Sequence, residues 1–460
     1  MKYSIFIFRR DLRIEDNTTL NYLLKNYNNV IPVFIFTPEQ VKNNKFKSDN
    51  AIQFMIESLH NLDQEFKKYG SRLHVFYGKN RKILKRIMKK VDIECIGYNK
   101  DYTNYAQSRD KKIASLCKKS DIECVSNEDY LLKQMGELNK DNGETYTVYT
   151  PFKNNCLKHK IDKPVILSKK EYNRLCKLPE KLVKEEGYID HEINPDILVK
   201  GGRDKAIETL NNALKLKNYE GNRNDLSYTT SLLSAYIKFG NISIREAYHA
   251  IKDRFGLDSG LLAQLVWREF YFYISYYFPR VLEGKNYNKK YDNIDWVENN
   301  QDYKKWCNGE TGYPVVDAGM RELNKTGYMH NRSRLITSNF LNRMLGMDWR
   351  LGEIYFARKL TDYDPSVNNG NWQWVSSVGV DPKPYFQRLF NPMLQSEKFD
   401  SNAEYIKKWI PSLEKIPSKE LHNWGDNYHK YNLKDIEYVK PIVDYGEARK
   451  RSVAMYRAVL

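Results

Sequence analysis

The first 130 residues of the chain alternate between short apolar runs and longer stretches with helical periodicity. Five runs rich in β-branched and aromatic residues predict strands, at 3–8, 30–36, 72–77, 92–99 and 122–125. Between the second and third runs, apolar residues recur every three or four positions from Ile52 to Phe66, and Gly70 marks the end of a helix. Such alternation predicts a parallel sheet covered by helices on both faces.

The predicted α/β domain over residues 1–130 is Rossmann-like in its alternation, but it lacks the usual nucleotide motifs. The loop after the first strand reads FRRDLRIEDN (8–17) and is not the glycine-rich dinucleotide fingerprint. No phosphate-binding Walker A loop occurs in the chain either. The common nucleotide-binding interpretation of an α/β domain therefore has no support in this sequence.

The character of the chain changes twice after this domain. Residues 131–200 are irregular and hydrophilic, which predicts a long interdomain linker with short helices around 151–160. After Gly201 and Gly202 the strand signals nearly vanish, and long helical patterns with many aromatic residues follow. We therefore expect an α/β domain, a linker and an all-α domain over 201–460.

Composition narrows the class of protein. Hydrophobic residues make up 41% of the 460, which is typical of a globular chain. No apolar run reaches the roughly 18 residues needed to cross a membrane, and the N-terminus does not resemble a signal peptide. The six scattered cysteines show no zinc or disulfide pattern, so a reducing, intracellular setting is expected and no metal site is predicted. The net charge of +17 is compatible with nucleic acid as a partner, but Lys-rich composition alone would also produce it.

Tryptophan is concentrated in one part of the predicted helical domain. Six of the eight tryptophans are Trp267, Trp296, Trp306, Trp349, Trp372 and Trp374. A large helical core explains any one of them. A series of buried indoles can also pass an electron from the surface to a redox cofactor.

The stretch 261–278 is apolar nearly all round and predicts a buried helix. Gln264, Trp267 and Arg268 share one of its faces. A buried arginine needs a partner, which is either an acid such as Glu269 or a ligand with phosphates or carbonyls.

Two further helices carry polar residues near their starts. Thr229, Thr230 and Ser231 precede an apolar helical run, with Ser234 expected one turn inside it. Such hydroxyls cap a helix or bind a phosphate.

The second of these helices is expected within 327–341, where Asn331 and Arg334 lie three residues apart. His330 by itself is more often a satisfied core or surface residue than a catalyst.

Taken together, these segments resemble the photolyase/cryptochrome family. The resemblance rests on FRRDLRIEDN, YTPFKNNCLK (149–158), TSLLSAYIKFG (230–240), WREFY (267–271), TGYPVVDAGMRELNKTGYMHNR (311–332) and DYDPSVNNGNWQW (362–374). These motifs occur in the family's order, and the resemblance runs from residue 4 to about 450, most closely to class I enzymes that repair cyclobutane pyrimidine dimers.

The resemblance implies a helical domain that holds FAD folded into a U shape. By motif position, the cofactor-binding residues would be Tyr219, Thr230, Ser231, Leu232, Leu233, Ser234, Arg268, Arg334, Asp362, Tyr363, Asp364 and Asn368. Asn368 would face the flavin N5. Trp372, Trp349 and Trp296 match the family's electron chain, in order from flavin to surface.

The family reaction is driven by light: the excited, reduced flavin donates an electron to a pyrimidine dimer in DNA, the dimer bonds break, and the electron returns. A dimer must leave the duplex to reach a buried flavin, and a poorly stacked lesion costs less to extrude. Residues that match substrate and DNA positions are Arg223, Gln264, Trp267, Asn331, Arg332, Trp374, Gln395 and Lys398.

Two departures from the family pattern concern the lesion. Cyclobutane-dimer enzymes usually carry Glu at the site of Gln264, and Gln cannot supply a proton as an acid does. Gln at this site is familiar in (6-4) photolyases, but those use a His pair where this chain has Asn331 and Leu335. Repair of cyclobutane dimers is therefore the first hypothesis and (6-4) repair the second.

A cryptochrome photoreceptor is the alternative from another class. Such receptors commonly add a long C-terminal tail and often change the N5-facing Asn. This chain ends with DYGEARKRSVAMYRAVL (444–460) and keeps Asn368, and both features favour repair.

A second, antenna chromophore (a folate, deazaflavin or flavin) is expected near 101–110, although Ala106 stands where folate-binding members carry Glu. We expect a monomer whose partner is damaged DNA.

Overall fold

The computed structural model, which describes residues 1–179, 185–380, 386 and 389–460, contains one five-stranded parallel sheet. Its strands are β1 (Tyr3–Phe8), β2 (Val30–Phe36), β3 (His74–Tyr77), β4 (Ile93–Asn99) and β5 (Glu123–Asn127), in the order β3-β2-β1-β4-β5. The five predicted strands are confirmed, and their bounds shift by at most two residues. The order places β1 in the middle of the sheet, so the residues that follow it lie at the centre of its carboxyl edge.

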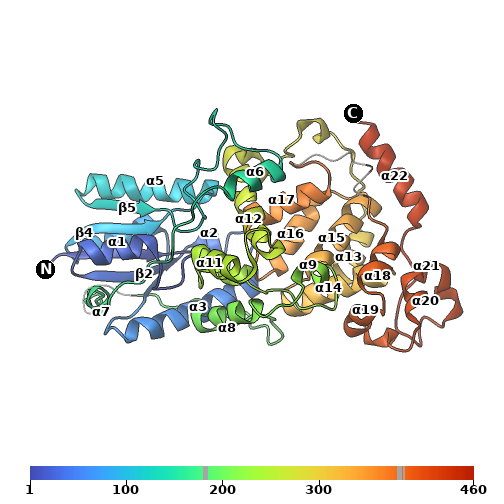
Figure 1. Ribbon diagram of the computed structural model, residues 1–460, viewed down its shortest axis with the longest axis horizontal. Helices are drawn as coiled ribbons and strands as arrows, with labels where there is room; N and C mark the ends of the chain where they lie inside the picture. Colours follow the sequence, from blue (N-terminus) through green and yellow to red (C-terminus); the bar gives the residue numbers. More distant parts are fainter. Residues whose placement is uncertain (180–184, 381–385, 387–388) are drawn as a thin grey trace.

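Helices cover both faces of this sheet, as the alternation predicts (Figure 1). On one face α1 (Thr18–Asn26) and α3 (Asp49–Lys67) pack against Phe6, Phe8 and Phe34. On the other face α4 (Asn80–Met88) and α5 (Asn104–Lys119) pack against the alternate strand residues, such as Ile5 and Ile7. The short helix α2 (Pro38–Val41) follows β2.

Residues 131–200 contain only two short helices in their described part, α6 (Tyr149–Cys156) and α7 (Lys169–Tyr172). The segment is nevertheless well anchored. Leu175 forms an isolated parallel bridge with Val30 at the start of β2, and α6 packs on α12 (Gly260–Tyr277). This stretch therefore links the sheet to the helices by contacts on both sides.

The rest of the described chain is helical and lies beside the sheet (Figure 1). Its α-helices, besides α12, are α8 (Arg203–Ala213), α9 (Tyr219–Asn222), α10 (Ser234–Phe239), α11 (Ile244–Phe255), α13 (Asn300–Asn308), α14 (Pro314–Thr326), α15 (Asn331–Asn339), α16 (Trp349–Lys359), α17 (Pro365–Val375), α18 (Pro392–Phe399), α19 (Glu404–Trp409), α20 (Ser418–His422), α21 (Trp424–Asn427) and α22 (Tyr445–Arg457). Helix α17 packs on both α12 and α16, which places these three at the centre of the molecule.

Buried polar contacts join the sheet to the helices. Arg13 and Arg245 both pair with Asp129, at 2.7 and 2.9 Å. Arg10 pairs with Asp364 at the start of α17, and the Tyr130 hydroxyl donates to the same carboxylate at 2.9 Å. Leaving such buried charges without partners would cost several kcal/mol, so these contacts fix the relative position of the two parts.

Among the described residues, none of the helices has the length and apolar character needed to span a membrane.

Candidate flavin and DNA site

Helix α12 is buried along most of its length, as expected, and its polar face is half-buried. Arg268 donates to the carbonyl oxygen of Tyr130 at 2.9 Å and lies over the Tyr130 ring. The alternative of an ion pair with Glu269 is wrong, because Glu269 accepts instead from the backbone N–H groups of Leu132 and Lys133. The Nη2 atom of Arg268 is buried without a protein partner, which favours a ligand at this position.

Arg334 of α15 and Asp362 form an ion pair of 2.9 Å, and the hydroxyl of Ser234 donates to the same carboxylate oxygen at 2.6 Å. Burial opposes the charge on Arg334, but Asp362 outweighs it and raises the pKa of the guanidinium. The other carboxylate oxygen of Asp362 is buried without a donor. The ring of Tyr328 lies beneath Arg334 in the same cluster.

The loop before α10 differs from its predicted form. The helix begins at Ser234 rather than one turn earlier, and none of the preceding hydroxyls caps it. Leu232 has a left-handed φ of 53°, which turns the chain between Ser231 and Leu233. The loop from Thr230 to Leu233 is therefore irregular backbone that can follow the shape of a ligand. Tyr219 begins α9 and packs against the core of this part of the molecule.

Helix α17 begins with Asp364 as N-cap and Pro365 at the first position. Both carboxylate oxygens of Asp364 have protein partners: one accepts from the N–H groups of Ser366 and Val367, and the other from Arg10 and Tyr130. Neither carboxylate oxygen of Asp364 therefore lacks a hydrogen-bond partner, and the contact with a cofactor stays a prediction.

Asn368 lies one turn into α17 and is buried. Its amide nitrogen donates to the carbonyl oxygen of Glu353 on α16 at 3.1 Å. Its amide oxygen is then free to accept a hydrogen bond from the other side, an assignment that follows from the bonding pattern.

The three tryptophans of the predicted electron chain differ in depth. Trp372 and Trp349 are buried, while Trp296 is half-buried in the segment before α13. A Cβ at Gly352 would lie 2.0 Å from the Trp372 ring, so the glycine lets this indole pack directly on the helix that Trp349 begins. Among the described residues, the recorded ring contacts of Trp372 are with Phe356 at 5.0 Å and Trp306 at 6.4 Å, and none joins it to Trp349.

Three of the predicted DNA contacts gather near α15. Arg332 donates to Gln395 of α18 at 3.4 Å and to Asn224 at 2.7 Å. Burial and, next, the positive charge of Arg223 lower the pKa of Arg332, so two guanidinium groups lie close together. The Nε atoms of both arginines are buried without partners. Such a pair of cations favours an anion such as a phosphate.

The remaining predicted contacts lie at less enclosed positions. Lys398 and Asn331 are exposed, whereas Trp267 and Trp374 are half-buried. The amide nitrogen of Gln264 donates to the carbonyl oxygen of Gly260 at 3.3 Å, within its own helix.

His330 is the N-cap of α15, and its Nδ1 accepts from the N–H of Arg332 at 3.2 Å. Burial, followed by the charges of Arg332 and Arg334, lowers the pKa of His330 to about 4. The imidazole is therefore neutral near pH 7 and not an acid, and its Nε2 is buried without a partner among the described residues.

A cavity of about 540 Å³ opens at the carboxyl edge of the sheet, against α16 and α17. The structure places Tyr363 here, with its ring stacked on Phe46, and not with Asp362 and Arg334. Arg9 and Arg109 line the cavity, and each has a buried N–H group without a partner. The lining residues Asp101, Thr103, Asn104 and Tyr105 come from the stretch in which an antenna site is expected.

Comparison with known proteins gives matches over almost the whole chain. A family model described as DNA photolyase matches residues 4–168, and one described as the FAD binding domain of DNA photolyase matches residues 261–458. The deoxyribodipyrimidine photo-lyase of Alkalihalophilus pseudofirmus is 32% identical, with 98% of this chain and 97% of that protein covered. The chain belongs to the DNA photolyase family.

Two solved structures agree with this assignment. An archaeal photolyase from Sulfolobus tokodaii, crystallised with two FAD molecules, has a TM-score of 0.86 and 39% identity over 99% of this chain and 100% of its own. A bacterial class III photolyase from Agrobacterium tumefaciens has a TM-score of 0.90 and 31% identity over 100% of this chain and 98% of its own.

The residues of the helical part fit FAD, the cofactor of this family. The unpaired Nη2 of Arg268 is a donor for a phosphate or carbonyl oxygen, and the unpaired oxygen of Asp362 is an acceptor for a ring N–H. Asn368 offers a further acceptor, and Trp372 lies one turn beyond it on α17. These groups come from α12, from α17 and from the segment before α17, where Arg334 and Ser234 hold Asp362.

Several residues that shape these sites were not singled out from the sequence. Tyr149 stacks on Trp267, Glu353 holds the amide of Asn368, and Arg9 and Arg109 enter the cavity. Only Arg9 had an available signal, because it directly follows the central strand, where parallel sheets bind ligands.

Proposed function

We propose that the protein uses light to split cyclobutane pyrimidine dimers in DNA, with FAD held among α10, α12, α15 and α17. The observation that carries the proposal is the cluster of Arg334, Asp362 and Ser234, in which one carboxylate oxygen of Asp362 is buried without a donor. Full-length relatives of this chain carry the name deoxyribodipyrimidine photo-lyase.

Bound FAD would supply the chemistry, since a reduced, excited flavin can give one electron to a dimer and take it back after the carbon–carbon bonds have broken. The chain's own residues bind and orient the cofactor. Arg268 and Ser234 would form hydrogen bonds with its polar groups, and the Thr230–Leu233 loop and Tyr219 would enclose it. Asp362, held by Arg334, would accept from a ring N–H, and the amide oxygen of Asn368 would face N5.

The predicted electron chain runs from Trp372 through Trp349 to Trp296, and of these three only Trp296 approaches the surface. Trp372 and Trp349 are 2% and 0% exposed, and Trp296 alone is half-buried.

DNA binding is proposed for the side of the helices that carries Arg223, Arg332 and Gln395. The unpaired Nε atoms of the two arginines favour backbone phosphates, although Arg223 also pairs with Glu220 at 3.1 Å, and such contacts make binding dependent on salt. Lys398 and Asn331 extend this surface, and Trp267 and Trp374 would receive the extruded dimer on their ring faces.

Cyclobutane dimers are preferred over (6-4) lesions because the site lacks an acid for proton transfer. Asn331 and Leu335 cannot donate a proton as histidine does, and His330 is neutral with a pKa of about 4. The class I assignment is likewise a proposal, since one structural relative is described as class III.

The cavity at the sheet edge is proposed as the antenna site. Its free arginine nitrogens suit a phosphate, and Phe46, Tyr105 and Tyr363 suit a flat ring. A flavin nucleotide is favoured, because one relative contains a second FAD. Ala106 is fully buried and supplies no carboxylate there.

The experiment is illumination of the reduced protein with blue light on an oligonucleotide that contains a thymine dimer. We expect the dimer to revert to two thymines. Bound FAD without reversal would refute repair and favour the photoreceptor alternative, whereas reversal of a (6-4) lesion instead would exchange the substrate. We further propose a monomer that acts inside the cell, which gel filtration and cell fractionation test.

A further inference from the structure

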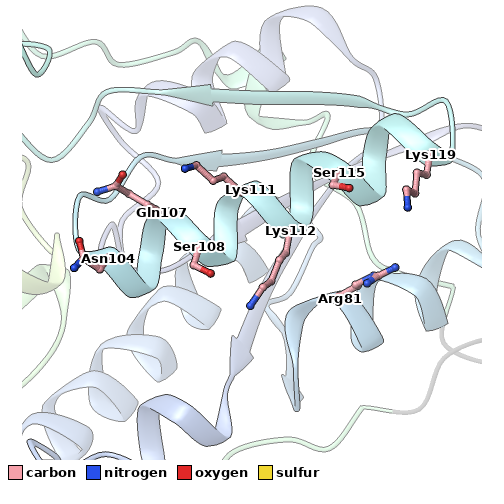
Figure 2. Close-up of a pocket in the computed structure, with 8 residues that line it drawn as sticks. All are labelled: Arg81, Asn104, Gln107, Ser108, Lys111, Lys112, Ser115 and Lys119. Carbon is pink, nitrogen blue, oxygen red and sulfur yellow. The ribbon is translucent and has the colours of Figure 1, made fainter.

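A groove between α4 and α5 crosses the face of the sheet domain opposite to α1 and α3 (Figure 2). Its volume is about 530 Å³. The lining residues are Arg81, Asn104, Gln107, Ser108, Lys111, Lys112, Ser115 and Lys119. On α5 most of them recur every three or four positions, so they form a continuous stripe along one side of that helix.

The groove is strongly basic and carries almost no compensating charge. Helix α4 contains four basic residues and no acid in NRKILKRIM. The single acid of α5, Asp110, pairs with Arg9 and Arg109 instead of facing the groove. Arg81, Lys111, Lys112 and Lys119 are exposed, and among the described residues none of the four has a recorded ion pair.

The other lining side chains narrow the class of partner. Ser108, Ser115, Asn104 and Gln107 are short hydrogen-bonding groups placed between the cations. Hydroxyl and amide groups beside lysines are typical contacts of a phosphate backbone. The groove has no large apolar side chain that would enter a lipid bilayer. Its length matches an extended anion, since Lys112 and Lys119 are seven helical residues, or about 10 Å, apart.

We propose that this groove is a second contact surface for nucleic acid, which binds the phosphate backbone of duplex DNA without regard to sequence or damage. The surface lies on the sheet domain, whereas the DNA contacts proposed above come from α9, α15 and α18 of the helical part (Figure 1). It rests on the proposed function only in that DNA is the polyanion the protein meets. Its effect is to hold the protein on undamaged DNA through counterion release.

The test replaces Arg81, Lys111, Lys112 and Lys119 by Gln in one variant of the full chain. A matched control replaces four exposed lysines on the opposite side of the sheet, Lys25, Lys163, Lys169 and Lys170. Binding of an undamaged 30-base-pair duplex is measured in the dark across a salt series. Because no light and no lesion are involved, failure of repair and failure of this proposal remain distinguishable.

We expect the groove variant to bind the duplex at least several-fold more weakly, and the slope of log K against log salt to fall by about 2 to 4. The control variant should change either quantity much less. Equal loss in both variants would overturn the proposal, because it would show an effect of net charge alone. Unchanged binding in the groove variant, or binding of anionic vesicles or inorganic phosphate that competes fully with the duplex, would also overturn it.

A second variant guards against misfolding of the fourfold replacement. Lys112→Glu changes one exposed side chain and should lower the salt slope by about 1 while leaving the melting temperature unchanged. An unaltered slope would contradict the proposal even if the fourfold variant does not fold.

Discussion

The rings of Tyr149 and Trp267 are stacked face to face, with centroids 3.6 Å apart and planes inclined by 7°. The Tyr149 hydroxyl also donates to the carbonyl oxygen of Ala263 at 3.0 Å, next to Gln264 on the same helix. One tyrosine from the segment between the domains therefore fixes both an indole and the helix that bears it. If the lesion stacks on Trp267, then Tyr149 fixes the orientation of the indole ring on which it stacks.

This relationship predicts the effect of Tyr149→Ala on lesion binding. Loss of an aromatic pair removes about 0.5–1.5 kcal/mol beyond burial, so affinity for a dimer-containing oligonucleotide should fall by about 2- to 10-fold. Tyr149→Phe keeps the stack and is the control, with a smaller loss. Photoreduction of the bound flavin should be unchanged in both variants, and a large change there would indicate general disruption instead.

Asn368→Asp tests the orientation of the amide. An aspartate cannot donate to the Glu353 carbonyl unless it is protonated, and its charge would lie beside the flavin. Loss of one buried hydrogen bond, about 0.5–1.5 kcal/mol, should speed air oxidation of the reduced flavin by about 2- to 10-fold. Absorbance after reduction measures this rate. Asn371→Asp, on the same helix, should leave it unchanged.

Phe replacements test the electron chain. Trp372→Phe, Trp349→Phe and Trp296→Phe should each slow photoreduction of oxidised flavin by tenfold or more, equivalent to at least about 1.4 kcal/mol of barrier. Trp306→Phe is the matched control, since Trp306 contacts Trp372 but lies outside the predicted chain. Repair by chemically reduced protein should persist in all four. Equal slowing by Trp306→Phe would mean that the electron passes through Trp306, which contradicts the predicted chain.

Gln264→Glu should raise the yield of dimer repair. A carboxyl group can donate a charge-assisted or acidic hydrogen bond to a dimer radical, which is roughly twice as strong as a neutral one. The yield of thymine per absorbed photon is the measurement, and Gln264→Met should lower it. No gain from Glu would mean that Gln264 is no handicap in this protein.

His330 should make the protein less stable in mild acid. Burial lowers its pKa in the folded protein to about 4, below the ordinary histidine pKa of about 6.5, so the unfolded chain binds the proton first. The contribution of neutral His330 to the free energy of unfolding is fully present above pH 6.5. It falls as the pH drops toward 4, by a total of about 3 kcal/mol.

His330→Asn keeps a capping side chain and removes the titration. Urea unfolding at pH 7 and pH 5 should therefore show a smaller loss in the variant than in the wild type. The same loss in both would assign the acid sensitivity to other groups.

The sequence by itself determined the local structure and the order of the motifs. Alternating periodicity specified five parallel strands and the helices on them, because a strand and a helix need different spacings of apolar residues. Helix α12 and the start of α17 were likewise legible, since burial and capping depend on neighbours in the chain.

Only the tertiary structure decided which polar atoms stay without partners. Arg268 could have met Glu269, but the fold turns Glu269 toward Leu132 and leaves one arginine nitrogen free. Asp362, Tyr363 and Asp364 are adjacent in the sequence, yet they serve the Arg334 cluster, the cavity and the sheet domain respectively. The reason is physical: the partner of each side chain comes from a segment that lies 28 residues away for Asp362 and Arg334 but 354 for Asp364 and Arg10, and the local sequence pattern does not specify such contacts.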